Sequence, residues 1–100
     1  MDEIRRVIDP DGREVVFGAG AFVHLARRRP WLLAHVEAIL ATVALPHHRE
    51  HDPIARRERF YARHLLLPDR WLRVIVDYND VPASVVTAFV DFDNPQERYR

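Results

Sequence analysis

The spacing of apolar residues changes its period once along this chain, near residue 57. Before that point, apolar side chains recur at helical spacing, at Leu32, Leu33, Val36, Ile39, Leu40 and Val43. After it, the segments 57–65, 71–78 and 84–90 alternate with a period of two, which is typical of half-buried strands. A helix and a set of strands must therefore bury their apolar sides against each other, and this predicts an α+β fold.

Two more elements are expected before the long apolar stripe. Residues 4–8 and 14–17 have the pattern of strands, and Asp9-Pro10-Asp11-Gly12 between them is a turn sequence in which Pro presets φ and Gly tolerates positive φ. These features predict an N-terminal hairpin. Residues 21–29 follow a helical pattern, and Pro30 ends that helix and suits the first position of the next one.

The connections between the three later strands are short, so we expect sequential strands to pair as an antiparallel meander. The predicted fold is α+β: an N-terminal hairpin, two helices, then a three-stranded antiparallel meander forming one sheet packed on the helices. Residues 46–56 are predicted to be a polar connection. A chain of 100 residues has room for one core, so we expect a single domain over residues 1–100.

Composition narrows the classes of protein further. The chain is 48% hydrophobic, which favours a folded globule over disorder. It contains no cysteine, which excludes disulfides, thiolate zinc sites and cysteine nucleophiles. Its start leads into no long apolar run, and no stretch approaches the ~20 apolar residues of a membrane span. We therefore expect a cytoplasmic protein.

The charge is distributed unevenly. Net charge is zero, which by itself argues against a nucleic-acid binder. Residues 21–73, however, carry ten arginines against five acidic residues. All the cationic residues are Arg, whose planar guanidinium binds phosphate in a bidentate manner better than Lys does. A GC-rich coding sequence would explain the same bias, so both interpretations stay open.

Alternation along the strands predicts one polar sheet face turned away from the helices. Arg59 and Arg63 flank Tyr61 on this face, with Arg73 on the next strand and Thr87 on the third. Cleaving RNA without a metal needs a base, an acid and cations that stabilise the charged phosphorane. Arginine suits the last role, tyrosine can stack on a base or give a proton, and threonine can donate to phosphate. An ordinary solvated sheet face would carry the same residue types.

A histidine on the first helix is a second candidate. On a helical wheel His24 lies on the polar face, with Arg28 one turn further on. An unperturbed imidazole pKa near 6.5 suits proton transfer. A plain surface histidine is the alternative.

The predicted connection 46–56 contains His47, His48, His51 and Asp52. Imidazole and carboxylate ligands could bind zinc. The cluster lacks a rigid helical frame and a clear fourth ligand, so we expect a polar loop, no metal and no cofactor.

Five short motifs resemble those of a known group of nucleases. They are His24-x-x-Arg27-x-x-Pro30-x-Leu32, Ile39-Leu40-Ala41-Thr42-Val43-x-x-Pro46, Arg57-x-Arg59-Phe60-Tyr61, Trp71-Leu72-Arg73-Val74-Ile75-Val76 and Val85-Val86-Thr87-Ala88-Phe89. Over roughly residues 3–92 the chain resembles the barnase–EndoU–colicin–RelE-like nuclease superfamily, most closely its phage-barnase-like branch. The resemblance implies helices followed by an antiparallel sheet, RNA cleavage without metal, and often a toxin with a protein antitoxin. It also implies active residues at His24, Arg59 and Thr87.

We therefore expect a metal-independent ribonuclease-like toxin domain that cleaves RNA by 2′-hydroxyl attack. The candidate catalytic residues are His24, Arg59, Tyr61 and Thr87, and the candidate substrate-binding residues are Arg28, Arg63 and Arg73. The expected partners are RNA and a protein antitoxin or immunity protein. The alternative is a non-catalytic protein- or RNA-binding module with the same fold. Zero net charge and the absence of lysine are departures from an RNA-cutting toxin.

Overall fold

Strands dominate the second half of the chain and helices the middle. The computed structural model describes residues 3–63 and 70–91. The elements are β1 (Glu3–Ile8), β2 (Glu14–Gly18), α1 (Ala19–Arg28), the 3-10 helix η1 (Pro30–His35), α2 (Val36–Ala44), β3 (His48–His51), β4 (Arg57–Arg63), β5 (Trp71–Asp77) and β6 (Ala83–Asp91). No helix in these ranges is long and apolar enough to cross a membrane.

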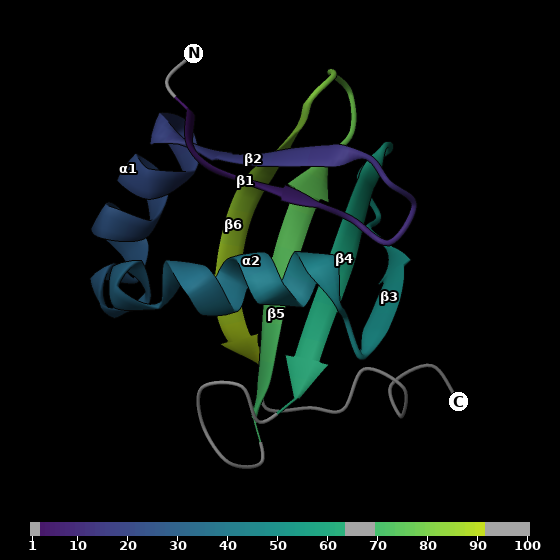
Figure 1. The fold of residues 1–100 in the computed structure, drawn as a ribbon. Helices are drawn as coiled ribbons and strands as arrows, with labels where there is room; N and C mark the ends of the chain where they lie inside the picture. Colours follow the sequence, from purple (N-terminus) through teal and green to yellow (C-terminus); the bar gives the residue numbers. More distant parts are fainter. Residues whose placement is uncertain (1–2, 64–69, 92–100) are drawn as a thin grey trace.

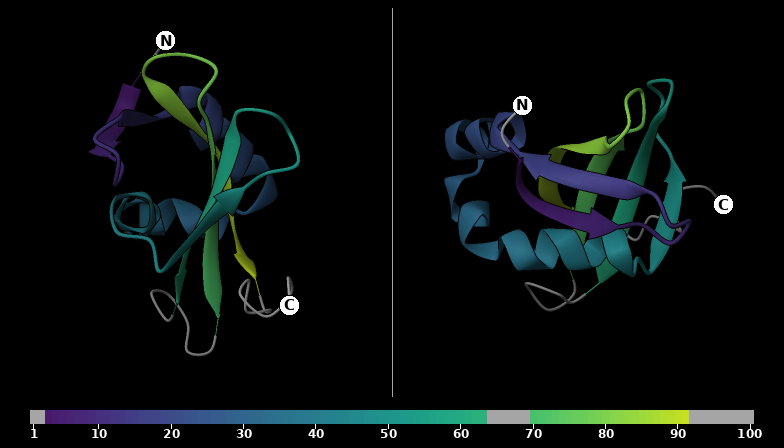
Figure 2. Two further views of the ribbon diagram at one scale, coloured as in Figure 1. Left: turned by 90° about the vertical axis from the view of Figure 1, so that its right-hand side faces the viewer. Right: turned by 45° about the horizontal axis from the view of Figure 1, so that its top comes forward.

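The six strands form one mixed sheet in the order β1-β2-β6-β5-β4-β3. Neighbouring strands are antiparallel except β2 and β6, which pair in parallel through Val15 with Ala83 and Val16 with Ser84. Helix α2 crosses one side of the sheet, the β1–β2 hairpin folds over that same side, and α1 stands beside β6 (Figures 1 and 2). We call the side covered by α2 the inner face and the opposite side the outer face.

The predicted fold class is wrong. We expected a three-stranded antiparallel meander, but the sheet has six strands and contains a parallel pair. The hairpin joins the meander strands because the parallel pairing attaches β2 to β6, a long-range contact with no local sequence signal. Residues 48–51, expected to lie in a polar connection, form β3. The sequence of this strand has no apolar alternation from which it could be predicted. It is defined by its antiparallel pairing with β4.

The other element boundaries also differ in detail. The apolar stripe that predicts one helix after Pro30 spans a 3-10 helix and then α2. The first of the three later strands ends at Arg63, and the rest of the expected segment 57–65 lies outside the described residues. A register shift between Ile75 and Val76 moves β6, so that Val85 and Ala88 are buried. Strict alternation predicts Val86, Ala88 and Val90 on the helix side of that strand, so the shift puts Val85 in the place of Val86.

The core lies between the inner face and the elements that cover it. Its members come from β2, α1, η1, α2 and the strands β4 to β6, and they include Val15, Phe17, Leu25, Leu32, Ile39, Leu40, Val43, Phe60, Leu72, Val74, Val76 and Ala88. Apolar burial of this kind is the main favourable term in folding. The helical stripe and the alternating strands therefore meet as the sequence pattern requires.

A buried carboxylate ties the hairpin turn to the sheet. Asp9 is 3% exposed and accepts backbone N–H groups of Asp11 and Arg13, both at 2.9 Å. Its second oxygen accepts the Tyr78 hydroxyl at 2.7 Å. Burial acts to raise the pKa of Asp9, but these hydrogen bonds and the nearby Arg49 outweigh it and hold the pKa below its usual value.

We expect Asp9→Asn to lower the free energy of unfolding by about 1–3 kcal/mol at pH 7, because it removes a charged acceptor of three hydrogen bonds. Because the pKa of Asp9 is lower in the folded protein, its stabilising contribution is fully present above the pKa of the unfolded chain, ~3.9. The contribution is lost as the pH falls through the folded pKa. Urea denaturation at pH 7 and at pH 3 should show the difference between wild type and variant shrinking in acid. Asp80→Asn, on an exposed loop, is the control, and an equal acid response there would contradict the assignment.

We expect Ile39→Ala, at a fully buried position of α2, to lower the free energy of unfolding by about 2–5 kcal/mol through lost burial and a residual cavity. The matched control is Leu45→Ala, where the side chain is 81% exposed and the change should stay within about 0.5 kcal/mol. Thermal or urea denaturation measures both. Similar losses at the two positions would show that the packing of α2 on the sheet is misassigned.

Candidate functional site

The outer face carries a continuous arrangement of polar and aromatic side chains across four strands. Residues paired in register on neighbouring strands point to the same side of a sheet. One row is His48, Tyr61, Arg73 and Phe89, and the next is Glu50, Arg59, Ile75 and Thr87. The structure thus places four predicted site residues, Arg59, Tyr61, Arg73 and Thr87, on one face.

Strand β3 adds two residues that sequence reasoning did not assign to the site. His48 pairs with Tyr61, and Glu50 pairs with Arg59. The His48 Nε2 lies 2.9 Å from Glu50 Oε1, so the imidazole and the carboxylate are hydrogen-bonded. Alternation of His48 and Glu50 at i and i+2 is the only sequence signal for this pair, and it becomes informative only once residues 48–51 are known to form a strand.

Arg59 lies between two carboxylates. Its Nε donates to Asp52 Oδ1 at 2.8 Å, and its Nη1 lies 3.6 Å from Glu50 Oε2. The side chains are largely buried, with 16% of Arg59 and 6% of Asp52 exposed. His48, Glu50 and Arg59 therefore form one connected chain of a base, an acid and a cation.

Burial and pairing have opposite effects on these charges. Burial acts to lower the pKa of Arg59, but hydrogen bonds with Asp52 and Tyr61 raise it above its ordinary value. Burial acts to raise the pKa of Asp52, but the hydrogen bonds from Arg59 and the Ile54 N–H lower it. Both groups stay ionised at neutral pH, and Arg59 cannot act as a proton donor.

Three of the predicted site residues are more enclosed than the sequence suggests. Tyr61 has no exposed surface, because His48, Trp71 and Arg73 lie against its ring. It can hold Arg59 but cannot stack on a base. Arg73 forms an ion pair with Asp91 and lies 4.5 Å over the Phe89 ring, while its Nε and the Thr87 Oγ1 are buried without a hydrogen-bond partner.

The remaining predicted residues are dispersed. His24 and Arg28 belong to α1, which packs against β2 and β6, whereas β3 lies at the other end of the sheet (Figure 1). Strand β4 is itself two strands, roughly 10 Å, from β6. His24 is therefore not brought together with His48 and Arg59. Arg63 is exposed and lies 5.9 Å from the Trp71 ring at the end of β4.

A shallow hollow opens at the β3 end of this arrangement. It has a volume of about 450 Å³ and is lined by His48, Glu50, His51, Asp52 and Pro53. No group of three or more His, Cys, Asp or Glu side chains within residues 3–63 and 70–91 is arranged to hold a metal ion. His48 and Glu50, which are hydrogen-bonded and line the hollow, can offer proton transfer and hydrogen bonding there.

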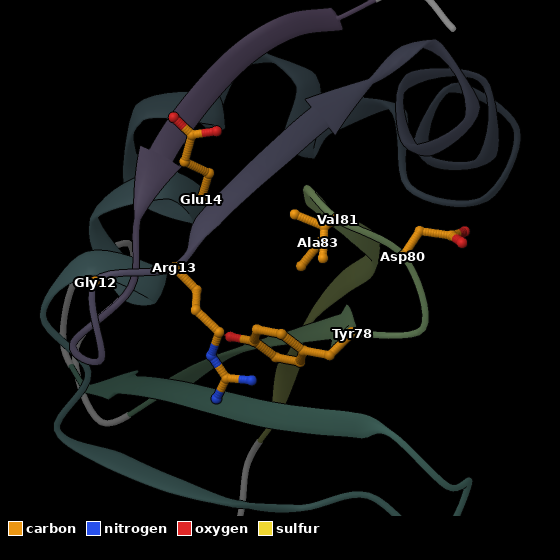
Figure 3. A pocket seen from close by; sticks show the side chains of 7 residues that line it. All are labelled: Gly12, Arg13, Glu14, Tyr78, Asp80, Val81 and Ala83. Atoms are coloured by element: carbon orange, nitrogen blue, oxygen red, sulfur yellow. The ribbon is translucent and has the colours of Figure 1, made fainter.

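A second cavity lies between the hairpin and the β5–β6 loop (Figure 3). It measures about 280 Å³ and is lined by Gly12, Arg13, Glu14, Tyr78, Asp80, Val81 and Ala83. Arg13 lies 4.4 Å from the Tyr78 ring centroid, and Tyr78 donates to Asp9. Arg13, Glu14 and Tyr78 are each engaged by a charged residue, and the lining contains no imidazole for proton transfer, so the β3 hollow is the stronger candidate site.

Comparisons with protein-family models, with curated proteins and with solved structures found no match to this chain. The site is therefore defined by its own geometry: the hydrogen-bonded pair His48–Glu50, with Arg59 fixed beside it.

The Arg59–Asp52 pair should couple more strongly than a surface pair. We expect a double-mutant cycle with Arg59→Gln and Asp52→Asn to give a coupling energy of about 1–3 kcal/mol. The same cycle at Arg5 and Glu37, whose side chains are 49% and 73% exposed, should give about 0–1 kcal/mol. Urea denaturation of the single and double variants measures both, and equal coupling would mean that Arg59 is not fixed by its burial and pairing.

Proposed function

We propose that this chain is a metal-independent RNA-cleaving domain whose reaction centre is His48, with Glu50 and Arg59 beside it. The observation that carries the proposal is the hydrogen bond between His48 and Glu50 at an open hollow, next to a fixed cation. A base, a carboxylate that orients it and a cation are the parts that 2′-hydroxyl attack on a phosphodiester requires.

Each residue has a distinct role in this proposal. With Nε2 donating to Glu50, the Nδ1 of neutral His48 is left as the basic nitrogen. It takes the proton from the 2′-hydroxyl, a bond forms between the 2′-oxygen and phosphorus, and the bond to the 5′-oxygen breaks. The leaving oxygen takes a proton from water. The products are a 2′,3′-cyclic phosphate and a 5′-hydroxyl end, and no metal takes part.

Arg59 and its neighbours prepare the site for negative charge. A guanidinium that is already fixed needs little reorganisation when charge builds up on the phosphorane. Asp52 and Tyr61 hold Arg59 in place, so we assign them positioning roles. The resemblance to a nuclease superfamily supports the same chemistry and adds a toxin role with a protein antitoxin or immunity protein as partner.

A non-catalytic binding module remains the second candidate. The favouring observation is that Arg59 and Arg73 are each paired with a carboxylate, Asp52 and Asp91. Paired charges of this kind also occur where a face has only a structural or interaction role. The cleavage assay below separates the two candidates.

We expect His48→Ala to reduce the rate of RNA cleavage by about 10²–10⁴-fold, because proton transfer is lost. Glu50→Gln should cause a smaller loss and change the pH profile, because the imidazole remains but its orientation is weakened. The assay uses labelled single-stranded RNA in EDTA, with the ends of the products identified chemically. A 2′-deoxy substitution at the cleaved nucleotide should abolish the reaction.

His47→Ala is the matched control, because the neighbouring His47 is exposed and does not line the hollow. His24→Ala tests the expectation drawn from the sequence. If this variant lost cleavage and His48→Ala did not, the reaction centre would lie on α1. Induced expression in a bacterial host should be harmful for wild type and harmless for His48→Ala. Wild type that neither cleaves RNA nor harms cells would favour the binding module.

A further inference from the structure

Most of the described arginines form ion pairs, but the corner between α1 and η1 is an exception. Within residues 3–63 and 70–91, Arg27, Arg28 and Arg29 have no carboxylate partner, and Arg27 and Arg28 are exposed. No acidic residue occurs between Glu14 and Glu37. In the part of the chain that the structure describes, no carboxylate therefore balances the positive charge of this corner, whereas Arg59 and Arg73 of the outer face are paired.

The same corner exposes a large aromatic ring. Trp31 is 48% exposed and lies edge-on to His35, with 6.2 Å between the ring centroids. The backbone here is well fixed, because the Arg29 N–H donates to Leu25 O at 2.7 Å and the Leu32 N–H donates to Arg29 O at 2.9 Å. An exposed indole that follows three arginines so closely in the chain is suited to stacking a base next to bound phosphates.

This corner is continuous with the outer face. The Arg29 guanidinium lies 5.1 Å from the Phe89 ring centroid, and Arg73 lies 4.5 Å from the same ring. Phe89 and Arg73 belong to the register row that ends at His48. That row crosses three strand spacings, roughly 14 Å, so a short extended strand can reach from the corner to the proposed reaction centre.

We propose that the α1–η1 corner, defined by Arg27, Arg28, Arg29 and Trp31, is a docking site for single-stranded RNA. The inference rests on the proposed function in taking RNA as the ligand, but it concerns binding away from the reaction centre. The arginines contact phosphates, and Trp31 stacks on an unpaired base. Duplex RNA binds less well, because its bases are already stacked and are not available to the indole.

The test measures binding separately from cleavage. The probe is a fluorescein-labelled 2′-O-methyl RNA of about ten nucleotides, which lacks the attacking hydroxyl. We expect Arg27→Gln/Arg28→Gln to weaken its binding to the full chain roughly 20-fold at 0.1 M salt and to lower the slope of log K against log salt by about 1.4. Trp31→Ala should weaken it about 5-fold to 150-fold, and Trp31→Phe should retain most of the affinity.

Arg5→Gln/Arg6→Gln is the matched control, because it removes the same charge from the exposed strand β1 and should leave affinity within about twofold. Unchanged affinity and salt slope in the Arg27/Arg28 variant would overturn the docking site. So would equal binding of a self-complementary duplex, or preferential binding of poly-glutamate through Arg27 and Arg28, which would indicate an acidic protein partner.

The failure of either proposal can be recognised separately. If 2′-O-methyl RNA binds through the corner but natural RNA is not cleaved, the docking site stands and the reaction centre fails. If natural RNA is cleaved through His48 while the Arg27/Arg28 and Trp31 variants bind and cleave as wild type does, the reaction centre stands and the docking site fails.

Discussion

Strand β3 is held in its observed place by the contacts of Arg49. This strand has four residues and lies at an edge of the sheet. On the inner side Arg49 donates to Glu58 at 2.7 Å and to Asp11 at 2.9 Å, and its guanidinium lies 4.6 Å from the Phe60 ring centroid. Because neighbouring residues of a strand point to opposite sides, fixing Arg49 inward directs His48 and Glu50 outward. The candidate site therefore depends on a contact made on the other face of the sheet.

The same contact links the two halves of the chain. Asp11 and Asp9 belong to the hairpin turn, while Glu58 lies in β4 and Tyr78 directly follows β5. A loss at this junction would weaken the attachment of the hairpin turn and of β3 together. Charged hydrogen bonds in a partly buried place are strong when complete and costly when one partner is removed. The polar junction thus supplements the apolar core at the place where the short edge strand has little apolar surface to bury.

Sequence patterns predicted the elements better than their assembly. The hairpin, the first helix and the strands near 57, 71 and 84 lie close to where periodicity placed them, because each has a local signal. The parallel pairing of β2 with β6 has none, since it joins residues about 70 positions apart in the chain. Alternation also placed Arg59, Tyr61, Arg73 and Thr87 on one face, but could not show that Tyr61 is enclosed. His48 and Glu50 were missed because their strand is polar throughout.

The order of the strands also affects how copies of this molecule meet. The two outermost strands are β1, which carries Arg5 and Arg6, and β3, with the sequence His48-Arg49-Glu50-His51. Unpaired backbone at the rim of a sheet can recruit another chain and begin aggregation, and short or charged rim strands discourage this. The more apolar strands β5 and β6, which would aggregate most readily, lie between other strands. The polar residues of β3, which made this strand hard to predict from the sequence, thus also protect the sheet against aggregation.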